Sequence, residues 1–240
     1  ARVLVCRYHG WTFKSSGECI RIKDEAAGFP NGVDKSCYNL TPVPRVESYK
    51  GFIFACLNPD APTLTEHLAE TRPFIDMLAD QSPEGMEVLP GSAAYVVDCN
   101  WKLQVENGVD GYHVGVVHRN FAQTVRRRNE INGASGMKLT ENARFDPGAV
   151  ETACYDLGNG HNIIWSDRGA PEAAPLYEAK DKVLPEVGQE KWDWMVGRGR
   201  NLLLYPNLFL MDQSSTQIRI IQPLSASSTE VRVYCIAPKG

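Results

Sequence analysis

Short runs of apolar residues, broken by turn-forming residues, dominate the first quarter of the chain. They predict strands at residues 2–6, 11–13, 19–22 and 49–57. Ser15-Ser16-Gly17 is typical of a turn between two of them. Residues 1–59 are therefore predicted to form a small β domain. Because strand-like patterns run up to both ends of the sequence, the chain is expected to be a piece of a longer protein.

The pattern changes after residue 59. Apolar residues recur at helical spacing over 64–79, and the composition of residues 103–118 suits a helix that inner glycines weaken. A further helix is expected at 190–204 and a long loop region at 129–160. Strands are expected at 91–102, 161–166, 208–211, 217–222 and 231–236. This order favours an α+β fold, with residues 60–240 forming a second domain of mixed or antiparallel sheet and helices.

Composition narrows the possible partners. The 240 residues are 43% hydrophobic and 22% charged, as in ordinary globular domains. Twenty-five Lys and Arg against 29 Asp and Glu give a net charge of −4, which leaves no basic excess for nucleic acid. The apolar stretch 202–211 is broken by Pro206 and is too short for a membrane helix. Seven widely spaced cysteines without a Cys-x-x-Cys pair favour a reduced, cytoplasmic protein.

The first candidate metal site is the hexapeptide Cys6-Arg7-Tyr8-His9-Gly10-Trp11. A thiolate and an imidazole in one tight turn can point at the same metal or cluster. Two ligands do not complete a site, and an isolated Cys-x-x-His is also compatible with a buried cysteine and a turn histidine. With its adjoining Gly10-Trp11, this hexapeptide resembles the second half of the Rieske iron–sulfur motif, and that resemblance favours the metal-binding interpretation.

The second candidate site is the segment from Glu106 to His118. Asp110 and His113 are three residues apart and would be neighbours on a helix. His113 and His118 are five apart, so a regular helix would rotate them by roughly 140° and separate their imidazoles. A π-type bulge, made easier by Gly115, would bring them together.

Two converging imidazoles and a carboxylate suggest a metal site with open coordination positions. Such a set is the facial triad of non-haem Fe(II) oxygenases, and zinc would accept the same ligands. Two unrelated histidines on a partly buried helix remain the alternative if the motif is taken alone.

Taken together, the two motifs resemble those of the large (alpha) subunits of Rieske non-haem iron aromatic-ring-hydroxylating dioxygenases. Similarity to the benzoate, toluate and anthranilate branch extends over nearly the whole chain, through segments such as Asn100-Trp101-Lys102-Leu103 and Tyr205-Pro206. The resemblance implies an α+β chain with a truncated Rieske iron–sulfur domain at 1–59 and a truncated catalytic non-haem iron domain at 60–240.

The resemblance also implies roles for five residues. Cys6 and His9 would bind a Rieske 2Fe–2S cluster whose other two ligands precede residue 1. His113 and His118 would bind a mononuclear Fe(II) whose carboxylate ligand lies beyond residue 240. Asp110 would be the bridging aspartate that hydrogen-bonds His113 and carries electrons toward a Rieske histidine of a neighbouring subunit.

Other residues are assigned less specific roles. By the same resemblance, Val109, Val114 and Met211 are expected to line the substrate pocket. Asp212 is a poor substitute for the missing iron ligand, because the family has no ligand at that place. His161, just before an apolar strand, is expected to be a core histidine. The three arginines at 126–128 are expected to form a solvated face.

The implied activity is addition of both atoms of O2 to an aromatic carboxylate, giving a cis-dihydrodiol or catechol. Electrons would come from NADH through a reductase. The parent is expected to be a trimer of large subunits, often with a small β subunit, and the fragment alone is expected to be inactive. The alternatives are a Rieske oxygenase acting on a polycyclic or phenolic aromatic, a zinc hydrolase using Glu106 or Asp110 as base, and an electron-transfer module without oxygen chemistry.

Overall fold

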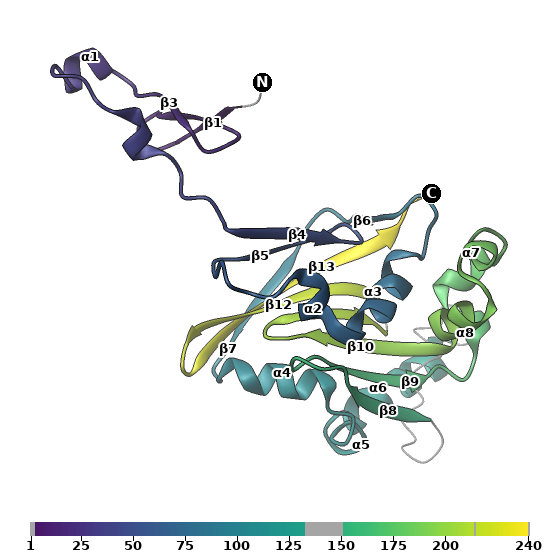
Figure 1. Cartoon of the computed structure of the whole chain (residues 1–240). Helices are drawn as coiled ribbons and strands as arrows, with labels where there is room; N and C mark the ends of the chain where they lie inside the picture. The colour runs from purple at the N-terminus through teal and green to yellow at the C-terminus, as the bar shows by residue number, and fades with distance from the viewer. Residues whose placement is uncertain (1–2, 133–150, 214, 240) are drawn as a thin grey trace. The chain divides into compact units, whose positions relative to one another are not determined.

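The structure is a computed structural model that describes residues 3–132, 151–213 and 215–239. The chain divides into two compact units, residues 1–64 and 65–240 (Figure 1). All strand pairs of the described residues are antiparallel, and helices alternate irregularly with the strands. The predicted α+β class is therefore confirmed.

The first unit consists of two small sheets. A core of Phe13, Cys19 and Ile22 stabilises the three-stranded sheet. The strands of this sheet are β1 (Val3–Val5), β2 (Thr12–Lys14) and β3 (Cys19–Arg21). They are followed by α1 (Glu25–Gly28), the 3-10 helix η1 (Lys35–Tyr38) and the second sheet, a hairpin of β4 (Arg45–Tyr49) and β5 (Phe52–Cys56).

The strand predicted at 49–57 contains β5 but begins too early, because Lys50 and Gly51 form the turn of the β4–β5 hairpin. Lys50 and Gly51 both have positive φ, of 50° and 86°, and these conformations reverse the chain. When only the alternation of apolar and polar residues is considered, the apolar residues on both sides of Gly51 predict a single strand.

The second unit is built on an eight-stranded sheet. Its path is β6-β13-β12-β11-β10-β9-β8, with β7 also paired to β13. The helical elements are α2 (Leu64–Leu68), η2 (Ala69–Thr71), α3 (Arg72–Ala79), α4 (Trp101–Val109), α5 (Val114–Val117), α6 (Arg119–Asn132), η3 (Pro171–Ala173), η4 (Pro175–Ala179), α7 (Lys180–Val187) and α8 (Gln189–Gly197). The strands are β6 (Met86–Val88), β7 (Ala93–Val97), β8 (Thr152–Asp156), β9 (Asn162–Asp167), β10 (Arg198–Leu204), β11 (Leu208–Asp212), β12 (Thr216–Ser225) and β13 (Ser228–Pro238).

Helices cover both faces of this sheet, with α4 on one side and α3 and α8 on the other (Figure 1). Side chains alternate along β10 accordingly. Leu203 packs in one core cluster with Val105 of α4. Arg200 faces the opposite way, because its guanidinium donates to the carbonyl oxygen of Trp194 in α8 at 2.9 Å. The strand is therefore buried on both faces, which explains its nearly continuous apolar sequence.

That burial explains why the predicted helix at 190–204 is wrong in its second half. The helix α8 ends at Gly197, and residues 198–204 are the central strand β10. A short apolar run buried on both sides lacks the period of two that marks a half-exposed strand. The predicted helix at 64–79 is likewise interrupted, at Ala69, where φ is 45°.

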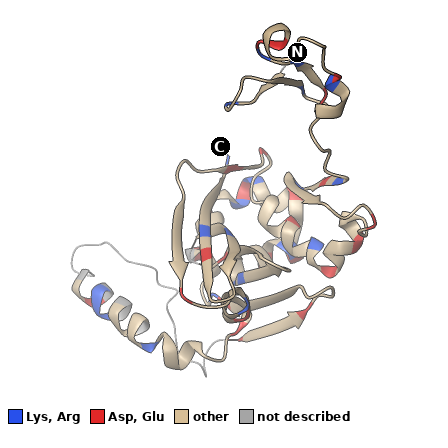
Figure 2. Cartoon of the chain, turned by 90° about the vertical axis from the view of Figure 1, so that its left-hand side faces the viewer, with Lys and Arg blue, Asp and Glu red and all other residues tan. Residues whose placement is uncertain are grey.

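Of the loop region predicted at 129–160, residues 133–150 lie outside the described residues. Its two ends are regular structure, because α6 continues to Asn132 and β8 begins at Thr152. Figure 2 shows Lys and Arg along α6, and charges of both signs on the rest of the second unit. In the part of the chain that the structure covers, no helix is both long and apolar enough to cross a membrane.

His161 is a core residue with both ring nitrogens in hydrogen bonds, as predicted. Its side chain is fully buried. Nε2 donates to the carbonyl oxygen of His67 at 2.7 Å, and Nδ1 accepts from the backbone N–H of Tyr205 at 2.8 Å. Because these partners require one N–H and one lone pair, they select a single neutral tautomer.

We predict that His161 makes the second unit sensitive to acid. Burial lowers the pKa of His161 from its ordinary value of 6.5. As pH falls, the unfolded chain therefore binds a proton at His161 before the folded protein does. The contribution of neutral His161 to the free energy of unfolding is complete above about pH 6.5 and is lost as pH falls toward the folded pKa. The variant His161→Gln should lose less of its thermal stability between pH 7 and pH 5 than the wild type. An unchanged slope of melting temperature against pH would contradict the prediction.

Candidate metal centres

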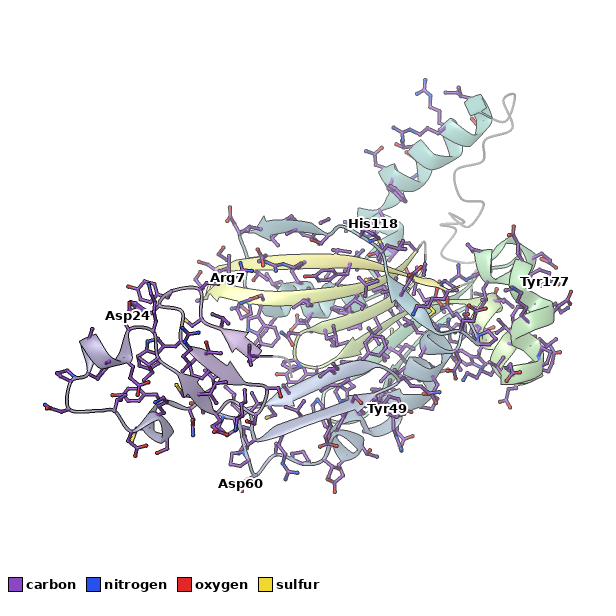
Figure 3. The ribbon with its side chains drawn as sticks, turned by 90° about the horizontal axis from the view of Figure 1, so that it is seen from above. Arg7, Asp24, Tyr49, Asp60, His118 and Tyr177 are labelled. Carbon is purple, nitrogen blue, oxygen red and sulfur yellow. The ribbon has the colours of Figure 1, made fainter. Side chains whose placement is uncertain are left out.

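The candidate ligands of the first unit lie in the turn between β1 and β2. The backbone closes this turn through two hydrogen bonds, from Cys6 N–H to the oxygen of Trp11 at 2.8 Å and from Gly10 N–H to the oxygen of Cys6 at 2.9 Å. Gly10 has φ of 75°, a conformation that a glycine adopts without strain. Arg7, labelled in Figure 3, lies in the same exposed turn.

The turn favours the thiolate form of Cys6. Hydrogen bonds from the backbone N–H groups of Tyr8 and His9 lower the pKa of the Cys6 thiol. A metal binds the thiolate, so this environment is suited to a ligand. All seven cysteines lie in described parts of the chain, and none is in a disulfide.

In the second unit, helix α4 leads directly to the other candidate ligands. The Asn100 side chain caps its start by accepting from the Lys102 N–H at 3.1 Å. The helix ends at Asp110, whose φ and ψ of −92° and 119° are extended. The continuous helix with a π-type bulge predicted at 103–118 is therefore wrong.

The two candidate histidines lie on either side of a single helical turn. His113 comes immediately before α5 and His118 immediately after it. Their Nε2 atoms are 3.1 Å apart. Metal–nitrogen bonds of about 2.0–2.1 Å allow two ligands of one ion to lie this close. His118 is labelled in Figure 3, at the point where α6 begins.

Asp110 contacts the imidazole of His113 at Nδ1, the ring nitrogen that does not face His118. Its Oδ2 lies 2.8 Å from Nδ1 of His113, and its Oδ1 accepts from the Tyr112 N–H at 2.6 Å. The hydrogen bond with His113, followed by that from Tyr112, lowers the pKa of the Asp110 carboxyl. An ionised carboxylate at Nδ1 orients the ring with Nε2 free to bind a metal.

Asn107 is a site residue that the sequence reasoning missed. Its Nδ2 lies 3.2 Å from Nε2 of His113, on the side that faces His118. The signal available in the sequence is its position one helical turn before Asp110, on the same face of α4. An amide this close to Nε2 of His113 would lie beside a metal bound to that atom.

Of the three residues predicted to line the pocket, Met211 lines a cleft between α4 and the sheet, together with Asn107. Val109 packs against the core cluster beneath α4. Val114 is partly buried in α5. The cleft belongs to the same face of the sheet as the two histidines.

Two side chains of the sheet hold the last carbonyl groups of α4. Asn201 Nδ2 donates to the oxygen of Gly108 at 3.1 Å, and the Cys154 thiol to that of Val109 at 3.4 Å. Burial raises the pKa of the Cys154 thiol, which keeps its proton available as a donor. These contacts give the carbonyl groups at the helix end partners just before Asp110.

Asp212 lies on the opposite face of the sheet, where it forms ion pairs with Arg200 and, at 3.5 Å, with Arg168. Its carboxylate is therefore engaged by arginines, in agreement with the prediction that it is not an iron ligand. Among the residues that the structure describes, no three His, Cys, Asp or Glu side chains form a metal-binding group.

An α+β chain with paired imidazoles backed by a carboxylate has the layout of a non-haem metalloenzyme. Residues 86–240 match the family model described as the ring hydroxylating alpha subunit, catalytic domain. The chain therefore belongs to the family of ring-hydroxylating alpha subunits. This confirms the family predicted from the two sequence motifs.

Individual relatives agree with this assignment. The chain is 46% identical to the toluate 1,2-dioxygenase alpha subunit of Pseudomonas putida, over 98% of this chain and 52% of the relative. It is 40% identical to the anthranilate 1,2-dioxygenase large subunit of Acinetobacter baylyi, over 99% and 52%. A structure of naphthalene 1,2-dioxygenase with bound indole matches with a TM-score of 0.73 at 27% identity, over 99% and 53%. The chain thus spans about half the length of these relatives.

We predict that Gly108 is required for the position of α4. A Cβ atom there would overlap the ring of Phe209, with Cε1 only 2.7 Å away. Gly108→Ala should therefore destabilise the protein by about 1–3 kcal/mol, despite the higher helix propensity of alanine. The free energy of unfolding from urea titrations measures this change.

Gly197→Ala is the matched control, because a Cβ added to this helical glycine would meet no atom of the described residues within 4 Å. Adding Phe209→Leu to Gly108→Ala should recover part of the loss, as measured in a double-mutant cycle. Equal effects of the two glycine substitutions would show that the contact with Phe209 is unimportant.

Proposed function

We propose that the parent protein is the large subunit of an oxygenase that adds both atoms of O2 to an aromatic carboxylate. The observation that carries this proposal is the convergence of the His113 and His118 Nε2 atoms, 3.1 Å apart, in a ring-hydroxylating alpha subunit. The toluate and anthranilate enzymes among its relatives support a carboxylated aromatic substrate. The product would be a cis-dihydrodiol or a catechol.

The donor atoms fit the two metal centres of such an enzyme. In our proposal, residues 1–59 are the C-terminal part of a Rieske domain and residues 60–240 are a catalytic domain. Cys6 and His9 would hold a 2Fe–2S cluster together with ligands from elsewhere in the parent chain. His113 and His118 would hold a mononuclear Fe(II), completed by a further carboxylate. When bound, the two centres supply the electron transfer and the oxygen chemistry.

The side chains around the imidazoles have separate tasks in this proposal. Asp110 fixes the tautomer of His113 and links it to the electron donor. Asn107 and Met211 line the adjoining cleft, where they would limit how a ring approaches the imidazoles. The apolar core around Phe209 beneath them excludes water from that side.

Exposed apolar side chains next to the histidines support an assembly of subunits. Tyr112, Val116 and Val117 are 98%, 81% and 66% exposed, respectively. Clustered exposed apolar residues typically mark an interface. We propose that neighbouring large subunits, and a small β subunit, cover this region in a trimer. An NADH-dependent reductase would supply electrons in the cytoplasm.

The test of this function is an analysis of the full-length parent purified without oxygen. Iron and acid-labile sulfide assays should give about three irons and two sulfides per large subunit. With reductase and NADH, benzoate should stimulate oxygen uptake and yield a diol. Zinc without sulfide would refute the oxygenase and favour the hydrolase, whereas a cluster without O2 consumption would favour an electron-transfer module.

We predict that Asp110→Asn separates metal binding from turnover. The asparagine oxygen can still accept a hydrogen bond from Nδ1 of His113, so iron content should be unchanged. Loss of the negative charge should lower turnover by about 10–100-fold. The measurements are metal content and single-turnover electron transfer from the reduced cluster. Asp98→Asn, at a position before α4, is the control, and normal turnover in Asp110→Asn would contradict the bridging role.

A further inference from the structure

The cleft between α4 and the sheet is lined by a cationic side chain, that of Arg219. It is a small cleft of about 40 Å³, and polar groups of Tyr95, Gln104, Asn107 and Arg219 lie around it. Arg219 comes from β12, where it pairs with Phe209 of β11. Because the Phe209 ring lies under Gly108 of α4, Arg219 is on the sheet face that α4 covers.

Arg219 has no acidic partner among the described residues. Its one hydrogen bond there runs from Nε to Oε1 of Gln217, at 2.9 Å. Two other arginines of the same sheet have such partners, since Arg200 pairs with Asp212 and Arg232 with Glu230, and Arg198 stacks on two tryptophans instead. The outer edge of the Arg219 guanidinium is therefore the part available to an anion.

The surroundings strengthen the preference of this cation for a carboxylate. Phe209, Ile221 and Val231 line the same cleft and are each 2% exposed or less. Apolar walls reduce the screening of a charge by water, so an anion is bound more strongly there than at an open surface. A guanidinium also matches a carboxylate through two parallel hydrogen bonds.

The cleft connects this cation to the candidate iron ligands. Asn107 lines the cleft, and its Nδ2 is also 3.2 Å from Nε2 of His113. A molecule with its anionic end at Arg219 would therefore extend past Asn107 toward the paired imidazoles. The cleft is small, so it would hold the carboxylate end rather than the whole ring.

We propose that Arg219 binds the carboxylate of the aromatic substrate and so determines which end of the ring faces the imidazoles. This inference rests on the proposed function and adds a specificity-determining residue to it. The expected consequence is discrimination against neutral aromatics, because the guanidinium lacks its anionic partner when the carboxylate is missing.

The test compares benzoate with benzamide, a neutral molecule of nearly the same shape, in equilibrium binding to the full-length enzyme. Calorimetry under anaerobic conditions avoids turnover. The wild type should bind benzoate at least tenfold more tightly than benzamide. Arg219→Gln should weaken benzoate binding at least tenfold, which corresponds to about 1.4 kcal/mol, and should leave benzamide binding within twofold. In oxygen uptake, KM for benzoate should rise more than kcat falls.

Two further variants keep the test decisive. Arg232→Gln removes a half-exposed arginine of β13 that pairs with Glu230, and should change neither affinity. Arg219→Lys keeps the charge but loses the two-point contact, so it should weaken benzoate binding by an intermediate factor even if Arg219→Gln does not fold.

Equal binding of benzoate and benzamide by the wild type would overturn the role of Arg219, as would equal weakening of both ligands in Arg219→Lys. These results would leave the oxygenase proposal intact if benzoate still stimulates oxygen uptake. Conversely, a wild type without aromatic-dependent uptake would refute the proposed function, whatever the binding data for Arg219.

Discussion

The close contact between helix α4 and the sheet is the constraint on which the candidate iron site depends. Gly108 has no side chain, and this allows the helix backbone to approach the ring of Phe209. At that distance Asn201 of β10 can reach the Gly108 carbonyl, and Cys154 of β8 can reach the next one. A larger residue at 108 would move the helix away and break both contacts.

The same contact determines where the helix ends. Gly111 continues the close approach, since a Cβ there would lie 2.6 Å from Cδ1 of Ile164. With the last carbonyls bonded to the sheet, the chain leaves the helix at Asp110 and begins a new turn at His113. The two histidines therefore flank a separate turn, α5, that begins only after α4 has ended.

Sequence reasoning identified the chemistry of this site better than its geometry. The residue types and spacing of Asp110, His113 and His118 pointed to a metal, but the end of α4 at Asp110 was not predicted. Gly108 and Gly111 flank this end, where an added Cβ would overlap Phe209 and Ile164. Those contacts join residues far apart in the sequence, so no local pattern contains them. For the same reason Asn107 and Arg219 were missed: their importance comes from the shared cleft.

In the fold, too, some elements were predicted correctly from the sequence and others were not. The strands β9, β11, β12 and β13 were placed correctly because their apolar patterns lie between clear turns. The strand β10 was mistaken for helix, since its continuous apolar run reflects burial on two faces that only the assembled sheet provides. Local patterns therefore predict short strands between clear turns well, and they fail for β10, which follows α8 without a turn that marks the boundary.

The charged side chains on the two faces of the sheet have different kinds of partner. On the face of α3 and α8, Arg168 and Arg200 share Asp212, and the guanidinium of Arg198 stacks on Trp165 and Trp194, 4.8 and 4.0 Å from the ring centroids. Each of these three arginines has an acidic or an aromatic partner within the chain. On the face of α4, Arg219 and the two imidazoles keep atoms available for other ligands. A partly buried arginine without an acidic partner among the described residues, beside apolar walls, is therefore the group on this face that is best suited to an anionic ligand.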